Sequence, residues 1–272
     1  RAFPDSSVAV LGVSPSLAVS QRLLAQEVAE CIGIPLVEIK TGEGEKDMYV
    51  ENEGQACYAC KTSLYQGMSW EAVVNWSSSR MPSNRGDGGE VQIKLYNGTN
   101  ADDVQDTTRV GLKAAREFNV CSPLLESGLS KEEVRAIGKA FGLPNWNTAA
   151  NPCLRSRLAL GVRATPDSLH QVEQAEEIVK EQLSLHGLLH PSTNLRVRHL
   201  NSGAAAVELD QHVLDALQSG CTVMRDDGVG AGMDQEDWQE DRLEVSKSGR
   251  GGYPGLEGML ASIAELGYRR VD

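Results

Sequence analysis

The chain has 272 residues, of which 40% are hydrophobic and 24% are charged. At about 150 residues per domain, this length and composition predict a folded protein of roughly two domains and argue against intrinsic disorder as its main state. No apolar run approaches the roughly 18 residues of a membrane span, and a net charge of −12 argues against general nucleic-acid binding, which needs a basic footprint.

Six cysteines and the absence of a signal-like apolar stretch predict a reducing compartment rather than a disulfide framework. We therefore expect a cytoplasmic protein, or one in an organelle stroma or matrix if a transit peptide lies upstream. The chain opens at Arg1 without an initiator Met, so we expect it to start downstream of the natural N-terminus. Cys31 and Cys121, in a predicted helix and a predicted strand, are expected to pack in the core.

Short apolar runs alternate with helical patterns in the first half of the chain. The apolar runs predict strands over 8–13, 36–39, 91–96 and 120–124, and the helical patterns lie over 23–32, 62–76 and 111–118. This alternation predicts a parallel sheet with helices on both faces. Ligands of such sheets bind at the carboxyl ends of the strands, so residues that follow each strand are candidate site residues.

Helix-start signals and a hairpin pattern dominate the second half. Ser130 and Glu133 form a capping box before one helix, and Thr165, followed by proline, opens a long amphipathic helix. The segments 195–199 and 204–209 alternate in polarity on either side of a turn, which predicts a β-hairpin.

These patterns predict two domains. We expect a nucleotide-binding domain over 1–150 and a smaller α+β domain over 165–272. An acidic, glycine-rich insertion is predicted over 224–252, and a smaller insertion over 77–90.

The sequence Cys57-Tyr-Ala-Cys60 is the sharpest local feature of the chain. A turn with this spacing brings two thiolates within reach of one metal ion, or makes a redox pair. Cys153 could supply a third thiolate, and three thiolates suit an iron–sulfur cluster better than structural zinc. Two incidental surface cysteines are the alternative.

Arginines gather in two places that could bind an anion. Cys153 is followed by Arg155 and Arg157, whose charges favour the thiolate and could grip a carboxylate or phosphate. Arg196 and Arg198 lie two apart on a predicted strand and share one face, where an anion between them would relieve their repulsion. Solvated arginines on a loop or a strand face are the alternative in both places.

The segment 97–103 directly follows a predicted strand. Gly98 permits close approach of a ligand, while Asp102 and Asp103 could hold a magnesium ion or a ribose. A structural turn explains the same composition.

Taken in order, the motifs resemble those of the LarE family of ATP-dependent sulfur transferases, in the PP-loop ATP pyrophosphatase superfamily. The motifs that carry the resemblance are Cys57-Tyr-Ala-Cys-Lys61, Asn97-Gly-Thr-Asn-Ala-Asp-Asp103, Arg109-Val-Gly-Leu112, Ser122-Pro-Leu-Leu-Glu126, Cys153-Leu-Arg-Ser-Arg157 and Leu195-Arg-Val-Arg198. The resemblance implies an α/β fold with a parallel-sheet, adenine nucleotide alpha hydrolase-like domain and a smaller α+β domain. It also implies a reaction in which ATP adenylates a carboxylate of a pyridinium-dicarboxylate mononucleotide. Sulfur then replaces oxygen to give a thiocarboxylate, on the way to a nickel-pincer nucleotide cofactor.

The resemblance assigns roles to individual residues. Cys153 is implied to donate sulfur or to bind a cluster, and its occurrence with Cys57 and Cys60 favours the [4Fe-4S] form of the family over the form that sacrifices one cysteine. The residues implied to bind ATP and Mg²⁺ are Lys61, Gly98, Thr99, Asp102 and Asp106. The residues implied to bind the substrate and its phosphate are Ser156, Arg157, Glu176, Arg196 and Arg198. A small-molecule nucleotide and a homo-oligomer are the partners we expect, without membrane or nucleic acid.

The 272 residues do not contain the superfamily's Ser-Gly-Gly-x-Asp-Ser phosphate loop, whose backbone amides cradle pyrophosphate. We therefore expect this chain to bind ATP weakly and to be inactive alone. An NAD- or GMP-synthetase-like amide-forming enzyme, or a tRNA thiolase, is the second interpretation. A non-catalytic nucleotide- or metal-binding remnant is the third.

Overall fold

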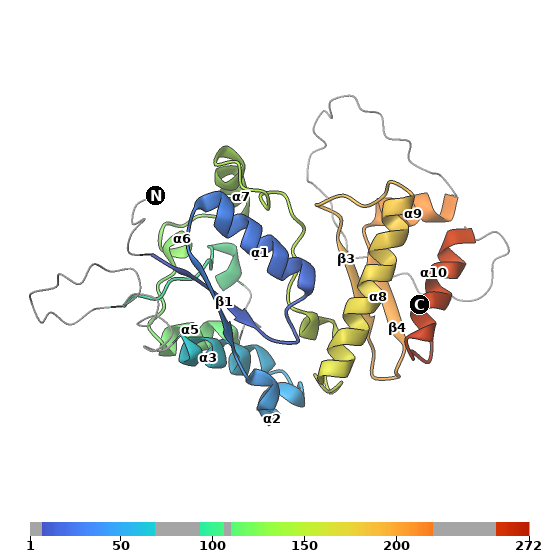
Figure 1. Ribbon diagram of the computed structural model, residues 1–272, viewed down its shortest axis with the longest axis horizontal. Coiled ribbons are helices and arrows are strands. Elements are labelled where there is room, and N and C mark those ends of the chain that lie inside the picture. The colour runs from blue at the N-terminus through green and yellow to red at the C-terminus, as the bar shows by residue number, and fades with distance from the viewer. Residues whose placement is uncertain (1–6, 69–92, 106–109, 220–253, 272) are drawn as a thin grey trace, which may run out of the picture. The chain divides into compact units, whose positions relative to one another are not determined.

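The computed structural model describes residues 7–68, 93–105, 110–219 and 254–271 (Figure 1). The chain divides into two compact units, one over 1–147 and one over 148–272. The predicted insertions over 77–90 and 224–252 lie outside the described residues. Within the described residues, no helix has the combined length and apolar character needed to cross a membrane.

The first unit begins with a β-α-β arrangement. Strand β1 (Ala9–Val13) pairs in parallel with β2 (Leu36–Lys40), and α1 (Val19–Ile32) connects them (Figure 1). Helix α1 ends at Gly33, whose φ of 76° is a left-handed conformation that glycine adopts without strain. These elements confirm the strand–helix–strand order predicted from the sequence.

Of the strands predicted over 91–96 and 120–124, the described residues form one bridge, and residues 91–92 lie outside the described residues. Tyr96 and Cys121 form an isolated parallel bridge, with the Cys121 amide 2.8 Å from the Leu95 carbonyl oxygen. The strand predicted over 120–124 is wrong beyond this bridge, because α6 (Pro123–Glu126) begins at Pro123. Proline suits the first turn of a helix, where its missing N–H has no partner to lose.

The helix that carries the Cys57–Cys60 motif begins earlier than predicted. Helix α3 (Ala56–Gly67) already contains both cysteines, so they lie in its first two turns and not in a preceding turn. Residues 69–76 of the predicted helix lie outside the described residues. Tyr65 of α3 packs against Phe118, with ring centroids 5.6 Å apart. The described part of the first unit also contains η1 (Glu43–Glu45), α2 (Asp47–Val50), η2 (Asp102–Val104), α5 (Gly111–Glu117) and α7 (Lys131–Ala140).

Two local predictions in the first unit have opposite outcomes. The capping box before α7 is confirmed, because Ser130 accepts a hydrogen bond from the Glu133 amide and Glu133 accepts one from the Ser130 amide. The prediction that Cys31 packs in the core is wrong, because its side chain is exposed. Cys31 lies about 200° around α1 from the buried Ala29, at about 100° per residue, and therefore on the opposite side.

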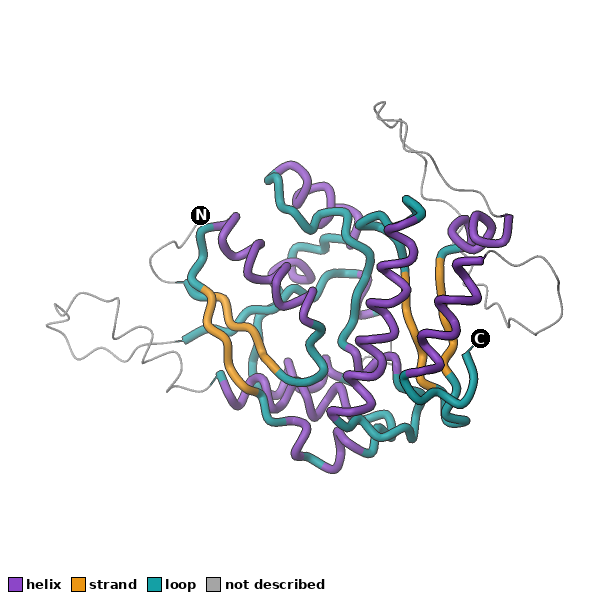
Figure 2. The backbone as a smooth tube through the Cα atoms, turned by 45° about the vertical axis from the view of Figure 1, so that its right-hand side comes forward, coloured by secondary structure: helices purple, strands orange, loops and turns teal. Residues whose placement is uncertain are grey.

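The second unit packs helices against a β-hairpin. Strands β3 (Leu195–His199) and β4 (Ala205–Leu209) pair antiparallel, as predicted. Helix α8 (Pro166–Leu185) packs on β3, and α10 (Pro254–Glu265) packs on α8 (Figure 2). The unit also contains η3 (Leu154–Arg157) and α9 (Gln211–Ser219).

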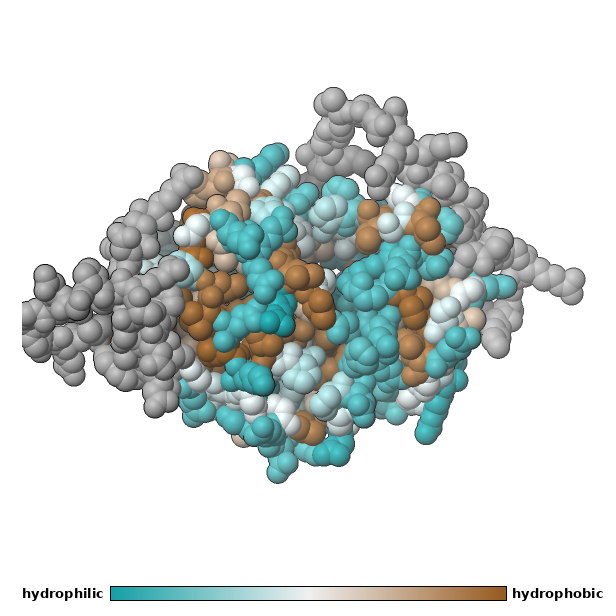
Figure 3. Space-filling view, in the orientation of Figure 1, coloured by the Kyte–Doolittle hydropathy of each residue, from teal (hydrophilic) through white to brown (hydrophobic). Residues whose placement is uncertain are grey.

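The amphipathic pattern of α8 is confirmed by its burial. Its apolar face is buried and consists of Leu169, Val172, Ala175, Val179 and Leu183. The face of α8 turned toward the viewer in Figure 3 is hydrophilic. The helix begins at the predicted place, where Thr165 accepts a hydrogen bond from the Ser168 amide. Ala175, Val179 and Leu183 of the buried face form one apolar core with the hairpin, α9 and α10.

Candidate functional site

The loop that carries Cys153 is bonded to the hairpin at the loop's C-terminal end, through Leu158 and Ala159. Leu158 forms a parallel bridge with His199, and the Ala159 amide donates to the His199 carbonyl oxygen at 2.9 Å. Leu154 is buried beneath the loop. Cys153 occupies the N-cap position of η3, and its side chain is exposed. The thiol therefore faces solvent from a loop whose backbone is well anchored.

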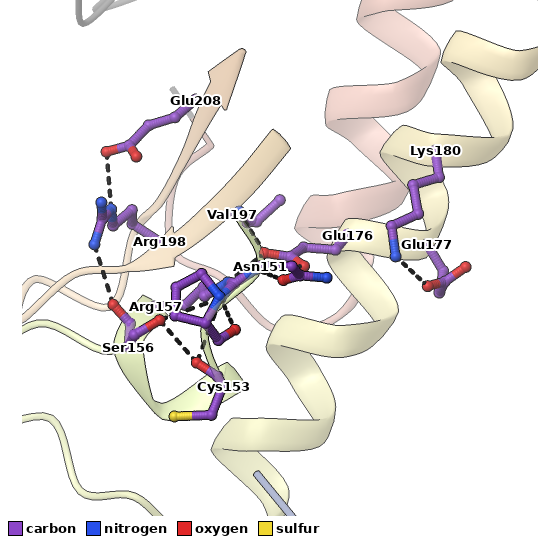
Figure 4. Close-up of polar contacts among 11 residues, drawn as sticks. Asn151, Cys153, Ser156, Arg157, Glu176, Glu177, Lys180, Val197, Arg198 and Glu208 are labelled. Carbon is purple, nitrogen blue, oxygen red and sulfur yellow. Dashed lines mark hydrogen bonds and ion pairs between the residues drawn. The ribbon is translucent and has the colours of Figure 1, made fainter. Parts of the chain in front are cut away.

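Arg157 is the largest fully buried side chain of the chain's described part, with 1% of its surface exposed. Its Nε donates to Glu176 Oε1 at 2.8 Å (Figure 4). One terminal nitrogen, Nη1, donates to the carbonyl oxygen of Pro152, and Nη2 donates to Asn151 Oδ1. Nη1 also lies 3.4 Å from the Cys153 carbonyl oxygen. The guanidinium thus binds the backbone on which Cys153 is mounted.

Glu176 is the acidic partner of Arg157 and is also buried, with 3% of its surface exposed. Besides the guanidinium, its Oε1 accepts a hydrogen bond from the Val197 amide at 3.2 Å. The carboxylate therefore connects α8, strand β3 and the Cys153 loop. Burial, with the nearby Glu176 carboxylate as a second cause, raises the pKa of Tyr268 above its ordinary range.

The two arginines of β3 share one face of the strand, as their spacing predicts, with the buried Val197 on the other. Arg198 Nε donates to Glu208 Oε1 at 2.9 Å, and Nη1 donates to the Ser156 carbonyl oxygen at 3.1 Å. The Arg196 side chain is half-buried and forms no hydrogen bond or ion pair with any residue that the structure describes.

Ser156 contacts both Arg157 and Arg198. Its hydroxyl donates to the Cys153 carbonyl oxygen at 2.7 Å and accepts from Arg157 Nη1 at 3.1 Å. The structure thus brings Cys153, Ser156, Arg157, Glu176 and Arg198 into one connected network.

The first unit holds the other two predicted thiols. Cys57 is exposed and Cys60 half-buried, on neighbouring turns of α3. Cys60 Sγ lies 3.9 Å from Oε1 of Glu43, a carboxylate that is 1% exposed. Sequence reasoning missed Glu43; its place just after β2 was the available signal. Lys61 is exposed on the same helix.

The loop predicted to bind ATP is closed by its own hydrogen bonds. Asp102 Oδ2 accepts from the Lys131 amide at 2.7 Å, and Asp103 Oδ2 accepts from the Asn100 amide at 3.0 Å. Gly98 is exposed and Thr99 half-buried. These contacts are those of a structural turn that leads into η2 and is hydrogen-bonded to the first residue of α7. Asp106 lies outside the described residues.

The iron–sulfur prediction gains no support from the described side chains. No three of their histidine, cysteine, aspartate or glutamate residues come together as a metal-binding group. Cys57 and Cys60 belong to the first unit and Cys153 to the second. The shared cluster stays a prediction.

Comparison with known proteins gives partial similarities, and no family model matches the chain. The chain is 36% identical over 172 residues to the uncharacterised protein slr1717 of Synechocystis. It is 39% identical over 72 residues to the pyridinium-3,5-bisthiocarboxylic acid mononucleotide synthase of Lactiplantibacillus plantarum. It is 38% identical over 80 residues to the glutamine-hydrolysing GMP synthase of Clostridium perfringens.

The matched regions cover only part of each protein. The match to slr1717 spans 63% of this chain and 58% of slr1717. The match to the synthase spans 26% of this chain and 26% of the synthase. The match to GMP synthase spans 29% of this chain and 15% of GMP synthase. The chain is therefore similar in part to two enzymes whose names describe mononucleotide synthesis.

Proposed function

We propose that the chain is part of an ATP-dependent enzyme of the PP-loop type, acting on a small nucleotide substrate as a sulfur transferase. The synthase and GMP synthase to which it is similar support the PP-loop assignment. The observation that carries the sulfur-transfer assignment is the exposed Cys153 thiol, on a loop whose backbone Ser156 and Arg198 hold by hydrogen bonds.

The proposed reaction has two parts. ATP first adenylates a carboxylate of a pyridinium-dicarboxylate mononucleotide and releases pyrophosphate. The Cys153 thiolate then attacks the activated carbonyl carbon and displaces AMP, which leaves a thioester. A base next removes the α proton of residue 153 while its Cβ–S bond breaks. The products are the thiocarboxylate and a dehydroalanine at position 153.

The remaining site residues are proposed to form two groups, one that binds the substrate phosphate and one that binds ATP with Mg²⁺. The substrate phosphate is proposed to contact Arg196, Arg198 and Ser156, because guanidinium groups bind phosphate in fork geometry. ATP with Mg²⁺ is proposed to contact the loop that begins at Gly98. The residues on this side are Lys61, Gly98, Thr99, Asp102 and Asp106.

The test supplies the substrate already activated, as its mixed anhydride with AMP, so that ATP binding by this chain is not required. Intact-mass spectrometry should then show a chain lighter by one H₂S, with the loss mapped to Cys153. Cys153→Ser should abolish the thiocarboxylate product, whereas Cys31→Ser, which removes an exposed thiol of the first unit, should not. Thiocarboxylate formation by Cys153→Ser would overturn the proposal. Iron and acid-labile sulfide in anaerobically purified protein would show separately whether a cluster is present.

A second candidate is an amide-forming enzyme, favoured by the similarity to GMP synthase. In that reaction ammonia, and not a thiolate, would displace AMP from the activated substrate. Amide formation that persists in Cys153→Ser would establish this candidate over sulfur transfer.

A further inference from the structure

We propose that Arg157 and Glu176 act as a positioning pair that fixes the backbone of Cys153, and that they do not bind the substrate. The naming of Cys153 as sulfur donor rests on the proposed function; the positioning itself rests on contacts within the second unit. Both side chains are buried, with exposed fractions of 1% and 3%. Neither presents a free surface to a nucleotide.

The donors of the Arg157 guanidinium are directed at this chain. Nε donates to Glu176 Oε1, Nη2 donates to Asn151 Oδ1 and lies 3.4 Å from Glu176 Oε2, and Nη1 donates to Pro152, Cys153 and Ser156. Two of these contacts are to the main-chain carbonyl oxygens of Pro152 and Cys153. Because main-chain contacts fix the peptide units on both sides of Cys153, they restrict where its side chain can point.

Glu176 transmits this restraint to the core. Its Oε1 is shared between Arg157 Nε and the Val197 amide in the centre of β3. The Cys153 backbone is therefore connected through two buried side chains to the hairpin. Figure 4 shows the Cys153 sulfur on the side of the loop away from Glu176. The pair thus holds the loop from within and leaves the thiol to react outside.

The geometry also explains why arginine is needed. Lysine would keep the charge beside Glu176, but a single ammonium group cannot reach Asn151 and the Pro152 carbonyl together. Removing the carboxylate charge instead would leave Arg157 buried without its counter-ion, which is strongly destabilising. Arg157→Lys therefore removes the contacts to the loop without leaving a buried charge unpaired, so its effect reports on the positioning of the loop.

Amide hydrogen exchange of the full chain, read residue by residue, tests the positioning. In Arg157→Lys the amides of Ser156 and Leu158, which are hydrogen-bonded within η3, should exchange about tenfold faster. Amides of α8 and β4 should keep their exchange rates. Glu176→Gln should accelerate the same two amides. Glu177→Gln, which removes the neighbouring exposed carboxylate paired with Lys180, should change neither.

Two outcomes would overturn the positioning pair. One is unchanged exchange of Ser156 and Leu158 in Arg157→Lys and Glu176→Gln. The other is equal acceleration throughout α8, β3 and β4 in Arg157→Lys, which would show a role in global stability. Asn151→Ala removes one contact and retains the ion pair; it should accelerate Ser156 exchange several-fold and serves if the other variants do not fold.

A kinetic measurement relates the pair to the proposed function. With the activated substrate, Arg157→Lys should lower the maximal rate of sulfur loss from Cys153 about tenfold. It should leave KM, here the substrate concentration that gives half the maximal single-turnover rate, unchanged, because the position of the thiol changes and the substrate contacts do not. A raised KM with an unchanged rate would instead make Arg157 a substrate ligand and overturn the proposal. The absence of sulfur loss in the unaltered chain would contradict the proposed function, while the exchange experiment would still decide on the pair.

Discussion

The rings of His199 and Tyr268 meet edge to face in the second unit, with their centroids 5.1 Å apart. Neither His199 Nδ1 nor the Tyr268 hydroxyl has a hydrogen-bond partner among the residues that the structure describes. Burial lowers the pKa of His199, and burial, with Glu176 as a second cause, raises the pKa of Tyr268. Both shifts keep the pair uncharged, next to the end of the loop that carries Cys153.

This pair predicts a loss of stability in mild acid. The pKa of His199 is lower in the folded chain than its unfolded value of about 6.5, so below that pH the unfolded chain binds more protons. The free energy of unfolding should fall as the pH drops from about 6.5 toward the folded pKa. One proton contributes at most about 1.4 kcal/mol per pH unit, and partial exposure makes the effect smaller.

The substitution that checks this is His199→Phe, which keeps an aromatic ring against Tyr268 and cannot titrate. Its Tm should fall less than that of the unaltered chain between about pH 7 and pH 5. An equal fall in both proteins would show that other groups cause the acid sensitivity.

The exposure of the cysteines predicts an order of thiol labelling. Cys31, Cys57 and Cys153 are exposed, whereas Cys60 and Cys121 are half-buried. A maleimide should therefore modify the first three faster in the folded chain, as peptide mapping after short exposure can show. Labelling in urea, where burial is lost, is the control and should remove the difference. Preferential labelling of Cys60 over Cys57 in the folded chain would contradict the placement of α3.

Local patterns in the sequence predicted the elements whose causes are local. Strands β1 and β2 are short apolar runs, and the α7 and α8 starts are set by side-chain caps a few residues away. The hairpin β3–β4 likewise follows from alternation on either side of a turn. In each case the residues that determine the element lie within about one turn of it.

The failures concern features that depend on distant residues or on competing signals. Pro123 ends the apolar run around Cys121 by starting a helix. The burial of Glu43 follows from packing of η1 against α3, which no spacing in the sequence reveals. The burial of Arg157 was likewise not predicted, because its partner Glu176 lies nineteen positions away on α8.

Gly12 on β1 offers a stability test of the first unit. A Cβ at this position would lie 2.8 Å from Thr41 Cγ2 and 3.0 Å from Leu64 Cδ1, so alanine would force both side chains to shift. Gly12→Ala should lower the free energy of unfolding by about 1–3 kcal/mol, measured by urea unfolding. Gly44→Ala is the matched control, because a Cβ there would meet nothing within 4 Å. Equal effects of the two substitutions would contradict the packing of α3 against β1.

The two arginines of β3 predict different consequences for binding and stability. Arg196 has no partner among the described residues, so Arg196→Gln should leave the Tm of the second unit nearly unchanged. It should raise KM for the activated mononucleotide about tenfold to a hundredfold, the effect expected when a charged hydrogen bond to phosphate is lost.

Arg198→Gln should raise KM and also lower the Tm, because Arg198 binds Glu208 and the Ser156 carbonyl oxygen. Lys180→Gln, which breaks an ion pair with Glu177 on α8, serves as a control for the loss of positive charge. An unchanged KM in Arg196→Gln would show that the phosphate does not contact β3. An equal loss of Tm in both arginine variants would mean that Arg196 is held by the protein and is not available to a ligand.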